Sequence, residues 1–150
     1  GKSPWRITDL ASSLFLSQSE VSKALKRMVY SGLIDEDKKE PSRSALYDLI
    51  STSIQYIFPI KPGQVLKGIA TAHSSNPLKS KIVSNNNYVW PHVDGKMRGE
   101  SIEPLYKNLP KAALADEKLH ELLSLVDAIR VGKAREQKLA LAEIKKRFDL

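Results

Sequence analysis

Apolar residues recur at helical spacing in two short runs near the start of the chain, between Ile7 and roughly Ile34. Steps of three and four residues between apolar positions predict two short helices. Their apolar faces are formed by Leu10, Ala11 and Leu14 in the first run and by Val21, Ala24, Leu25 and Met28 in the second. Gly32 follows the last turn, where a left-handed capping residue is expected, and Leu33 and Ile34 then predict a short strand.

Polar residues mark the start of the second helix. Ser17 and Glu20 have the spacing of a capping box, in which the serine oxygen accepts a hydrogen bond from a first-turn amide and the glutamate reaches back. Only two or three residues separate this start from the end of the first helix near Leu14, which suits two helices that cross steeply. The second helix would bury its apolar face against the first and leave these side chains outside: Gln18, Ser19, Ser22, Lys23 and Lys26.

The pattern changes in the middle of the chain. Ser42 begins a third helical period, which continues to Phe58 before the prolines at 59 and 62. Residues 61–110 are irregular and rich in glycine and proline, so we expect loops there, with a short helix near 77–83. One hairpin is expected around the dipeptide at 94–95, Asp-Gly, which suits tight turns.

A regular helical period returns near the C-terminus. Asp116 is the expected N-cap of a helix that breaks at Gly132, and a last helix is predicted over about 133–148. The apolar stripe of the first of these helices consists of Leu119, Leu122, Leu123, Val126 and Ile129. This stripe is either part of the core or a dimer seam, and the sequence does not choose between them.

The opening segment resembles the helix-turn-helix of winged-helix transcription regulators of the MarR type. Small or apolar residues occupy the positions where such motifs place them: Ala11, Leu16, Val21 and the exit Gly32, Leu33 and Ile34. The resemblance covers about residues 5–40 and departs from the pattern at Phe15, where a glycine is usual, and in a short acidic loop at 35–40. It also lacks a first helix, so either the chain starts partway into a domain or the helix from Ser42 fills that place.

The resemblance implies a winged-helix-like helix-turn-helix with a short wing. The apolar pattern adds an irregular middle segment and two C-terminal helices, so we expect a mainly α protein. We divide the chain into residues 1–60 as a DNA-binding domain, 61–110 as a connector or companion segment and 111–150 as a helical pair. The helix at 17–30 would enter the major groove of double-stranded DNA.

The residue chemistry of this helix supports the same interpretation, since amide and ammonium groups can bond purine edges and cations can meet phosphates. The side chains expected to face bases are Gln18, Ser19, Ser22 and Lys23. Those expected to contact phosphates are Lys26, Arg27, Lys38, Lys39 and Arg43. A generic helical hairpin whose serines and lysines face water is the alternative.

Charge supports a nucleic-acid partner only weakly. The formal net charge is +7 and the pI is about 9.6. Lys and Arg against Asp and Glu number 8 against 7 in residues 1–50, 7 against 3 in 51–110, and 9 against 7 in 111–150. Most of the surplus therefore lies outside the opening segment.

Composition excludes cysteine-dependent sites and membrane-spanning segments. The absence of cysteine excludes disulfides, thiolate metal sites and cysteine nucleophiles, and suits a reducing compartment. No apolar run approaches the roughly 20 residues that a membrane span requires. We therefore expect a cytoplasmic protein that does not bind membranes.

No catalytic or metal centre is predicted. Of the three histidines, His73, His92 and His120, only His120 has carboxylates near it on one helix, Asp116 and Glu117, and a surface histidine is the favoured interpretation. The glycines at 63 and 68 lack the lysine of a phosphate loop. Neither a metal nor another cofactor is therefore expected.

Three other hypotheses are kept. One is an antitoxin-like interaction module that grips a partner protein through residues 61–150. Another is a nucleic-acid-processing enzyme acting through residues 88–107, with Asp94, Glu100 and Glu103 as its acids. The third is binding of single-stranded nucleic acid by the basic aromatic segment of Tyr88, Trp90, Lys96, Arg98, Tyr106 and Lys107.

Under the helix-turn-helix hypothesis, the protein would act as a homodimer, as many helix-turn-helix proteins do.

Overall fold

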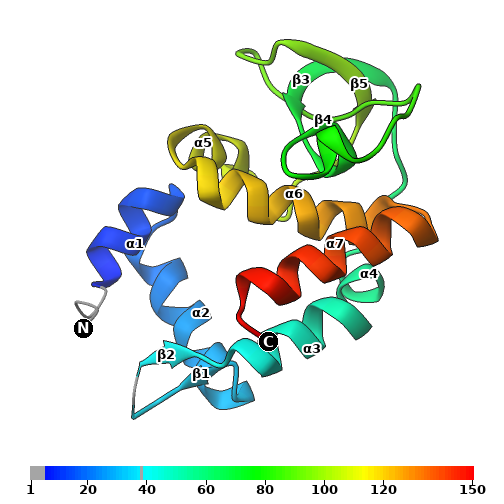
Figure 1. Cartoon of the computed structure of the whole chain (residues 1–150). Coiled ribbons are helices and arrows are strands. Elements are labelled where there is room, and N and C mark those ends of the chain that lie inside the picture. The colour runs from blue at the N-terminus through cyan, green and yellow to red at the C-terminus, as the bar shows by residue number, and fades with distance from the viewer. Residues whose placement is uncertain (1–5, 38) are drawn as a thin grey trace.

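The computed structural model describes residues 6–37 and 39–150, and this part of the chain is mainly α-helical with small sheets (Figure 1). In chain order its helices and strands are α1 (Ile7–Leu14), α2 (Gln18–Ser31), β1 (Ile34–Asp35), β2 (Glu40–Pro41), α3 (Arg43–Thr52), α4 (Ile54–Ile57), β3 (Val65–Ala70), η1 (Ala72–Ser74), η2 (Leu78–Ser80), β4 (Tyr88–Pro91), β5 (Met97–Ser101), α5 (Leu109–Ala115), α6 (Glu117–Val131) and α7 (Ala134–Arg147). The pair α1 and α2 lies at one side with the β1–β2 hairpin, α6 and α7 run through the middle, and the strands β3 to β5 form a separate lobe beside α6.

Three residues join α1 to α2. Phe15 caps α1 in the left-handed conformation with φ of 56°, so the position where a glycine is usual does adopt positive φ despite its bulky side chain. Ser17 accepts a hydrogen bond from the Glu20 amide at 3.0 Å, which confirms the serine half of the predicted capping box. Gly32 caps the end of α2 with φ of 83°, as predicted.

A two-residue hairpin follows α2. The strands β1 and β2 pair antiparallel, with Ile34 opposite Pro41 and Asp35 opposite Glu40. The predicted strand is therefore present but begins one residue later, and it has a short partner strand. Ser42 then caps α3 by accepting a hydrogen bond from the Ala45 amide at 3.3 Å.

The helix predicted to continue to Phe58 is broken at Ser53, and this part of the prediction was wrong. Ser53 has φ of −130°, and it separates α3 from the single turn of α4. The hydroxyl of Thr52 donates to the Asp48 carbonyl at 2.6 Å, and that of Ser51 donates to the same oxygen at 3.3 Å. Such bonds from serine and threonine back to the helix carbonyls bend helices, which accounts for the break.

Residues 61–110 are more regular than predicted, because β3, β4 and β5 close into a small barrel. Strand β3 pairs antiparallel with both β4 and β5, so these two run parallel to each other. The turn at Asp94 and Gly95 therefore does not form the predicted hairpin. A Cβ on Gly95 would lie 2.2 Å from the Gly68 carbonyl carbon, so the turn folds back onto β3 with the two backbones in contact. The short helix expected near 77–83 corresponds to η2.

The two C-terminal helices are confirmed. Asp116 caps α6 by accepting a hydrogen bond from the Leu119 amide at 3.1 Å, and α6 ends at Val131, immediately before Gly132. The larger core cluster of buried side chains consists of Ile50, Ile54, Ala72, Leu78, Ile82, Leu125, Val126, Ala128, Ile129, Ala140 and Ile144. A second cluster joins the barrel to α5 and α6 through Ile69, Trp90, Ile102, Leu109 and Ala113. Leu122, Leu123, Val126 and Ile129 of the α6 stripe lie within or against these clusters, which favours the core interpretation over a dimer seam.

Candidate nucleic-acid interface

The outer side of α2 carries most of the side chains predicted to face DNA. Ser19, Lys23 and Arg27 are exposed and follow one another at steps of four residues, which places them in one row along the helix. Lys26 is also exposed. None of these four side chains has a hydrogen bond or ion pair to any other residue that the structure describes. The row is therefore open to a partner.

Two predicted base contacts lie on a different flank of α2. With about 100° per residue, Gln18 and Ser22 project roughly a quarter to a third of a turn away from the row of Ser19 and Lys23. Ser22 is half-buried and, with Lys26, lines a groove beside α2, whereas Gln18 is exposed at the first turn. The structure therefore places Ser19, Lys23 and Arg27 in one row and Gln18, Ser22 and Lys26 in a neighbouring row on the groove side of α2.

The remaining predicted phosphate contacts are scattered. Lys38 lies outside the described residues. Lys39 is exposed between β1 and β2 and adopts φ of 52°. The guanidinium of Arg43 forms an ion pair with Asp149 at 3.1 Å, so α3 directs this side chain toward the C-terminal end of the chain. Arg43 would have to give up this pair to reach a phosphate.

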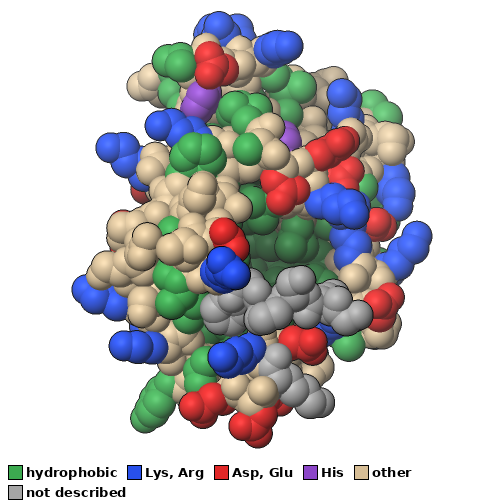
Figure 2. All heavy atoms as spheres, turned by 90° about the vertical axis from the view of Figure 1, so that its left-hand side faces the viewer, with side chains coloured by type: hydrophobic (Ala, Val, Ile, Leu, Met, Phe, Trp, Pro, Cys, Tyr) green, Lys and Arg blue, Asp and Glu red, His purple; other side chains and the backbone are tan. Residues whose placement is uncertain are grey.

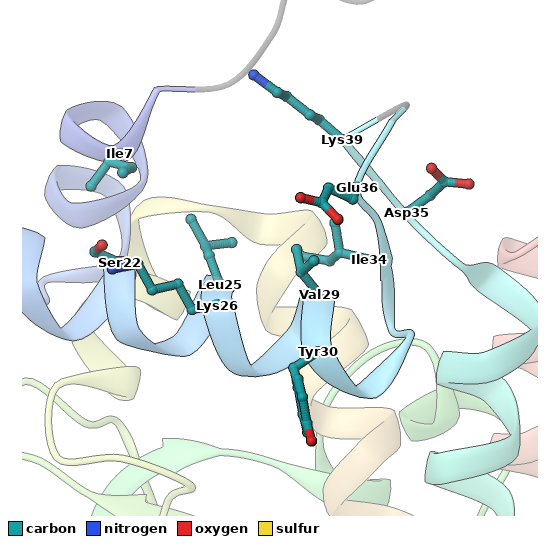
Figure 3. Close-up of a pocket in the computed structure, with 10 residues that line it drawn as sticks. All are labelled: Ile7, Ser22, Leu25, Lys26, Val29, Tyr30, Ile34, Asp35, Glu36 and Lys39. Carbon is teal, nitrogen blue, oxygen red and sulfur yellow. The ribbon is translucent and has the colours of Figure 1, made fainter.

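Tyr30 is a feature of α2 that the sequence reasoning missed. Its side chain is 96% exposed near the C-terminal end of the helix. Figure 3 shows the ring pointing away from the groove. A tyrosine that follows the polar row after Lys23 and Arg27 at helical spacing is a sequence signal that could have identified it.

Two side chains from the C-terminal half hold the turn before α2. The hydroxyl of Tyr106 donates to the Leu14 carbonyl at 3.1 Å, and the amide of Asn108 donates to the Phe15 carbonyl at 3.0 Å. We call Tyr106 and Asn108 the turn clamp. Burial raises the pKa of Tyr106 above its ordinary value, so its hydroxyl keeps the donated proton at neutral pH. The clamp satisfies carbonyls at the end of α1 and fixes where α2 begins.

Tyr106→Phe is expected to loosen this turn and to lower the free energy of unfolding by about 1 kcal/mol, because one partly buried hydrogen bond is lost. Native-state hydrogen exchange should show faster opening of the amides at 15–21, with little change in α6. Tyr56→Phe is the matched control, since Tyr56 is largely exposed and its hydroxyl has no partner in the described part of the chain. Equal effects of the two substitutions would contradict a role for the clamp.

A groove lies between α1, α2 and the β1–β2 hairpin, with a volume of about 820 Å³. We call it the α1–α2 groove. It is lined by Ile7, Ser22, Leu25, Lys26, Val29, Tyr30, Ile34, Asp35, Glu36 and Lys39. Figure 3 shows Leu25 pointing into the space between α1 and the hairpin, with Val29 and Ile34 close to each other. On the face of the molecule that Figure 2 shows, hydrophobic side chains gather at the base of a hollow, with charged side chains beside it.

A buried cluster of hydrogen-bonded side chains joins the barrel to α6. The carboxylate of Asp127 accepts hydrogen bonds from Thr71 Oγ1 at 2.7 Å and from Trp90 Nε1 at 2.8 Å. Its other oxygen forms a 2.8 Å ion pair with Arg130, whose Nε donates to the Phe58 carbonyl at 2.9 Å. Burial raises the pKa of Asp127, and these donors oppose the rise.

This cluster is buried, and its side chains are hydrogen-bonded to one another. Asp127 is 2% exposed and Trp90 is 0% exposed. Asp127, Thr71, Trp90 and Arg130 therefore have the geometry of a structural cluster, and we call them the junction. A signal was available in the sequence, since Asp127 and Arg130 interrupt a helix whose neighbouring positions are apolar.

His120 lies beside this junction but does not have the geometry of a catalytic base. Its Nε2 lies 2.8 Å from the Ala70 carbonyl and 3.4 Å from Ser75 Oγ. A nitrogen that donates to a carbonyl carries a proton, so it cannot take one from Ser75 in this arrangement. The described residues hold no group of three or more His, Cys, Asp or Glu side chains that could bind a metal ion.

The basic aromatic segment is not arranged as a stacking surface. Trp90 is buried in the second core cluster, and Tyr88 and Tyr106 are half-buried. Stacking of bases needs exposed ring faces, so this interpretation was wrong for Trp90. The acidic side chains of the enzyme hypothesis do not take part in the junction. Asp94 is exposed with one oxygen 3.9 Å from His92 Nδ1, and Glu103 has an exposed side chain and contributes only its carbonyl oxygen, which accepts from Arg130 at 3.4 Å.

Comparisons with known proteins gave no match, whether to family models, to curated proteins or to solved structures. Interpretation of the α2 surface therefore depends on its geometry and chemistry alone. Within the described residues, no helix is long and apolar enough to span a membrane.

Proposed function

We propose that this protein is a sequence-specific DNA-binding transcription regulator that places α2 in the major groove of double-stranded DNA. The observation that carries the proposal is the open row of Ser19, Lys23 and Arg27, with Lys26 beside it, on a helix joined by a three-residue turn to α1. An α-helix fits the width of the major groove, and side chains near its N-terminus reach base edges.

Each residue has a proposed role. Ser19 and Lys23, with Gln18 and Ser22 at the first turns, would contact bases. Lys26, Arg27, Lys38, Lys39 and Arg43 would meet phosphates, which give affinity without sequence information. The turn clamp supports this function indirectly, because it fixes the start of α2 against the rest of the chain.

The cell compartment and the assembly state belong to the same proposal. A regulator of this kind would act in the cytoplasm as a homodimer on paired half-sites about 34–36 Å apart or a multiple of that distance. No catalytic step is assigned. The antitoxin-like hypothesis, with a protein partner bound through residues 61–150, stays a prediction beside it.

Binding selection from randomised double-stranded DNA with the full chain tests the proposal. We expect enrichment of a short motif, and a palindromic motif would support two-fold pairing of α2 helices. A parallel selection with single-stranded DNA provides the comparison. Recovery of unenriched sequences from the duplex pool would contradict sequence-specific binding.

A further inference from the structure

The α1–α2 groove leaves apolar faces of two helices without a cover in the described chain. Each helix has one apolar face, yet Ala11 is the buried residue of α1 and Val21 that of α2. Ile7 is 38% exposed, and Leu25 and Val29 are only half-buried. Apolar surface of this kind, rimmed by polar residues, marks a place where another apolar surface binds.

We propose that the α1–α2 groove binds an amphipathic helix of a partner protein. The walls are α1 on one side and the β1–β2 hairpin on the other, with Leu25 and Val29 of α2 between them (Figure 3). A helix is convex and presents apolar side chains at steps of three and four residues, which is the arrangement that fills a hydrophobic groove. A second copy of the same concave groove would leave the space between the two floors unfilled.

Charges on α2 and on the hairpin define the chemistry of the partner helix. Lys26 stands on α2, and Glu36 stands on the hairpin and points toward α2 in Figure 3. Asp35 and Lys39 also line the groove from the hairpin, so the hairpin side has a net negative charge. Neither Lys26 nor Glu36 has an ion pair or hydrogen bond to another of the described residues. The partner helix should therefore carry acidic side chains along the flank that faces Lys26 and basic side chains along the flank that faces Glu36.

The groove and the proposed DNA-facing row are different surfaces of α2. Lys23 and Arg27 do not line the groove, whereas Leu25 and Val29 do. Ser22, Lys26 and Lys39 line the groove and also belong to the proposed DNA contacts, so a helix in the groove would compete with DNA for these three side chains and leave the row itself exposed. Glu36 and Ile7 have no part in the proposed DNA contacts, so variants at these positions test the groove without testing DNA binding.

Fluorescence anisotropy with labelled helical peptides tests the proposal. The probe is a synthetic peptide of about four turns, with leucines on one face, glutamates along one flank and lysines along the other. Two companion peptides carry glutamates or lysines on both flanks. The full chain should bind the mixed peptide saturably and more tightly than either companion.

Single charge reversals should then change the preference in opposite directions. Lys26→Glu makes the α2 side acidic like the hairpin side, so the peptide with lysines on both flanks should bind about two- to fivefold more tightly than the one with glutamates. Glu36→Lys should give the reverse order. Identical preferences in the two variants would overturn the assignment of the flanks.

A charge on the apolar α1 wall should weaken binding. Ile7→Glu is expected to weaken the mixed peptide at least about tenfold, while an acidic residue in the first turn favours the helix dipole and preserves α1. The matched control is Ile57→Glu, since Ile57 is exposed on α4, outside the groove. Wild-type binding by Ile7→Glu would overturn the proposal, as would concentration-dependent self-association that this substitution abolishes, because a second copy would then occupy the groove.

Discussion

Asp127→Ala is expected to lower the free energy of unfolding by about 3–5 kcal/mol, because it leaves a buried guanidinium without its partner. Arg130 would keep only carbonyl acceptors, and the donors of Thr71 and Trp90 would lose the oxygen that they share. Urea denaturation followed by far-ultraviolet circular dichroism measures the loss. Trp90 fluorescence reports the same transition from inside the junction.

An exposed ion pair supplies the control. Asp149→Ala removes the carboxylate that pairs with Arg43, at side-chain exposures of 82% and 51%, and should cost less than about 1 kcal/mol. In a double-mutant cycle, adding Arg130→Met to Asp127→Ala should recover part of the loss, because the unpaired charge is removed too. A cost for Asp127→Ala no larger than that of Asp149→Ala would contradict the structural role of the junction.

The pH dependence of this effect has a defined sign. Burial raises the pKa of Asp127, so the folded chain holds this proton more tightly than the unfolded chain does. The contribution of Asp127 to stability is therefore complete below the unfolded pKa, about 3.9, and declines as the pH rises through the folded value. The destabilisation by Asp127→Ala should grow as the pH is lowered from 7 to 4, and a loss that shrinks in acid would contradict the raised pKa.

The helices could be predicted from the sequence because their signals are local. Ser17 and Asp116 each cap a helix through an amide three residues away, and Gly32 ends α2 at the residue where the apolar period stops. The break at Ser53 also has a local cause, the hydrogen bonds from the Ser51 and Thr52 hydroxyls to the Asp48 carbonyl. The spacing of apolar residues carries no information about such bonds, so it could not predict the break.

The barrel could not be predicted in the same way, because its order comes from distant pairings. Residues 65–70 pair with residues 88–91 and 97–101, and the backbones of Gly68 and Gly95 lie in close contact. Short strands rich in glycine and proline have little alternation to detect. The junction at Asp127 has the same cause, since its partners Thr71 and Trp90 lie 56 and 37 residues away in the chain.

Part of the candidate site depends on local sequence and part on contacts between distant residues. The row of Ser19, Lys23 and Arg27 follows from the period of one helix, so the sequence could predict it. The ion pair of Arg43 with Asp149 and the clamp of Tyr106 on Leu14 join residues 106 and 92 positions apart. No periodic pattern links such positions, and only the packed chain brings them together.

Lys23→Ala combined with Lys26→Ala is expected to weaken binding to duplex DNA at least about tenfold, because the row would lose one base contact and one phosphate contact. The logarithm of the affinity should also fall less steeply with the logarithm of the salt concentration, by about one to two units of slope. Mobility-shift titrations at several salt concentrations measure both quantities. Both side chains are exposed without partners in the described chain, so the fold should be preserved.

The control removes the same charge from another surface. Lys145 and Lys146 are exposed in the last turn of α7, and replacing both with alanine lowers the net charge by the same amount. If DNA binding depended on net charge alone, the two double variants would lose the same affinity. The salt dependence of their affinities would also weaken equally. A loss confined to the α2 variant would place the contact on that helix, whereas unchanged affinity of the α2 variant would contradict the proposed function.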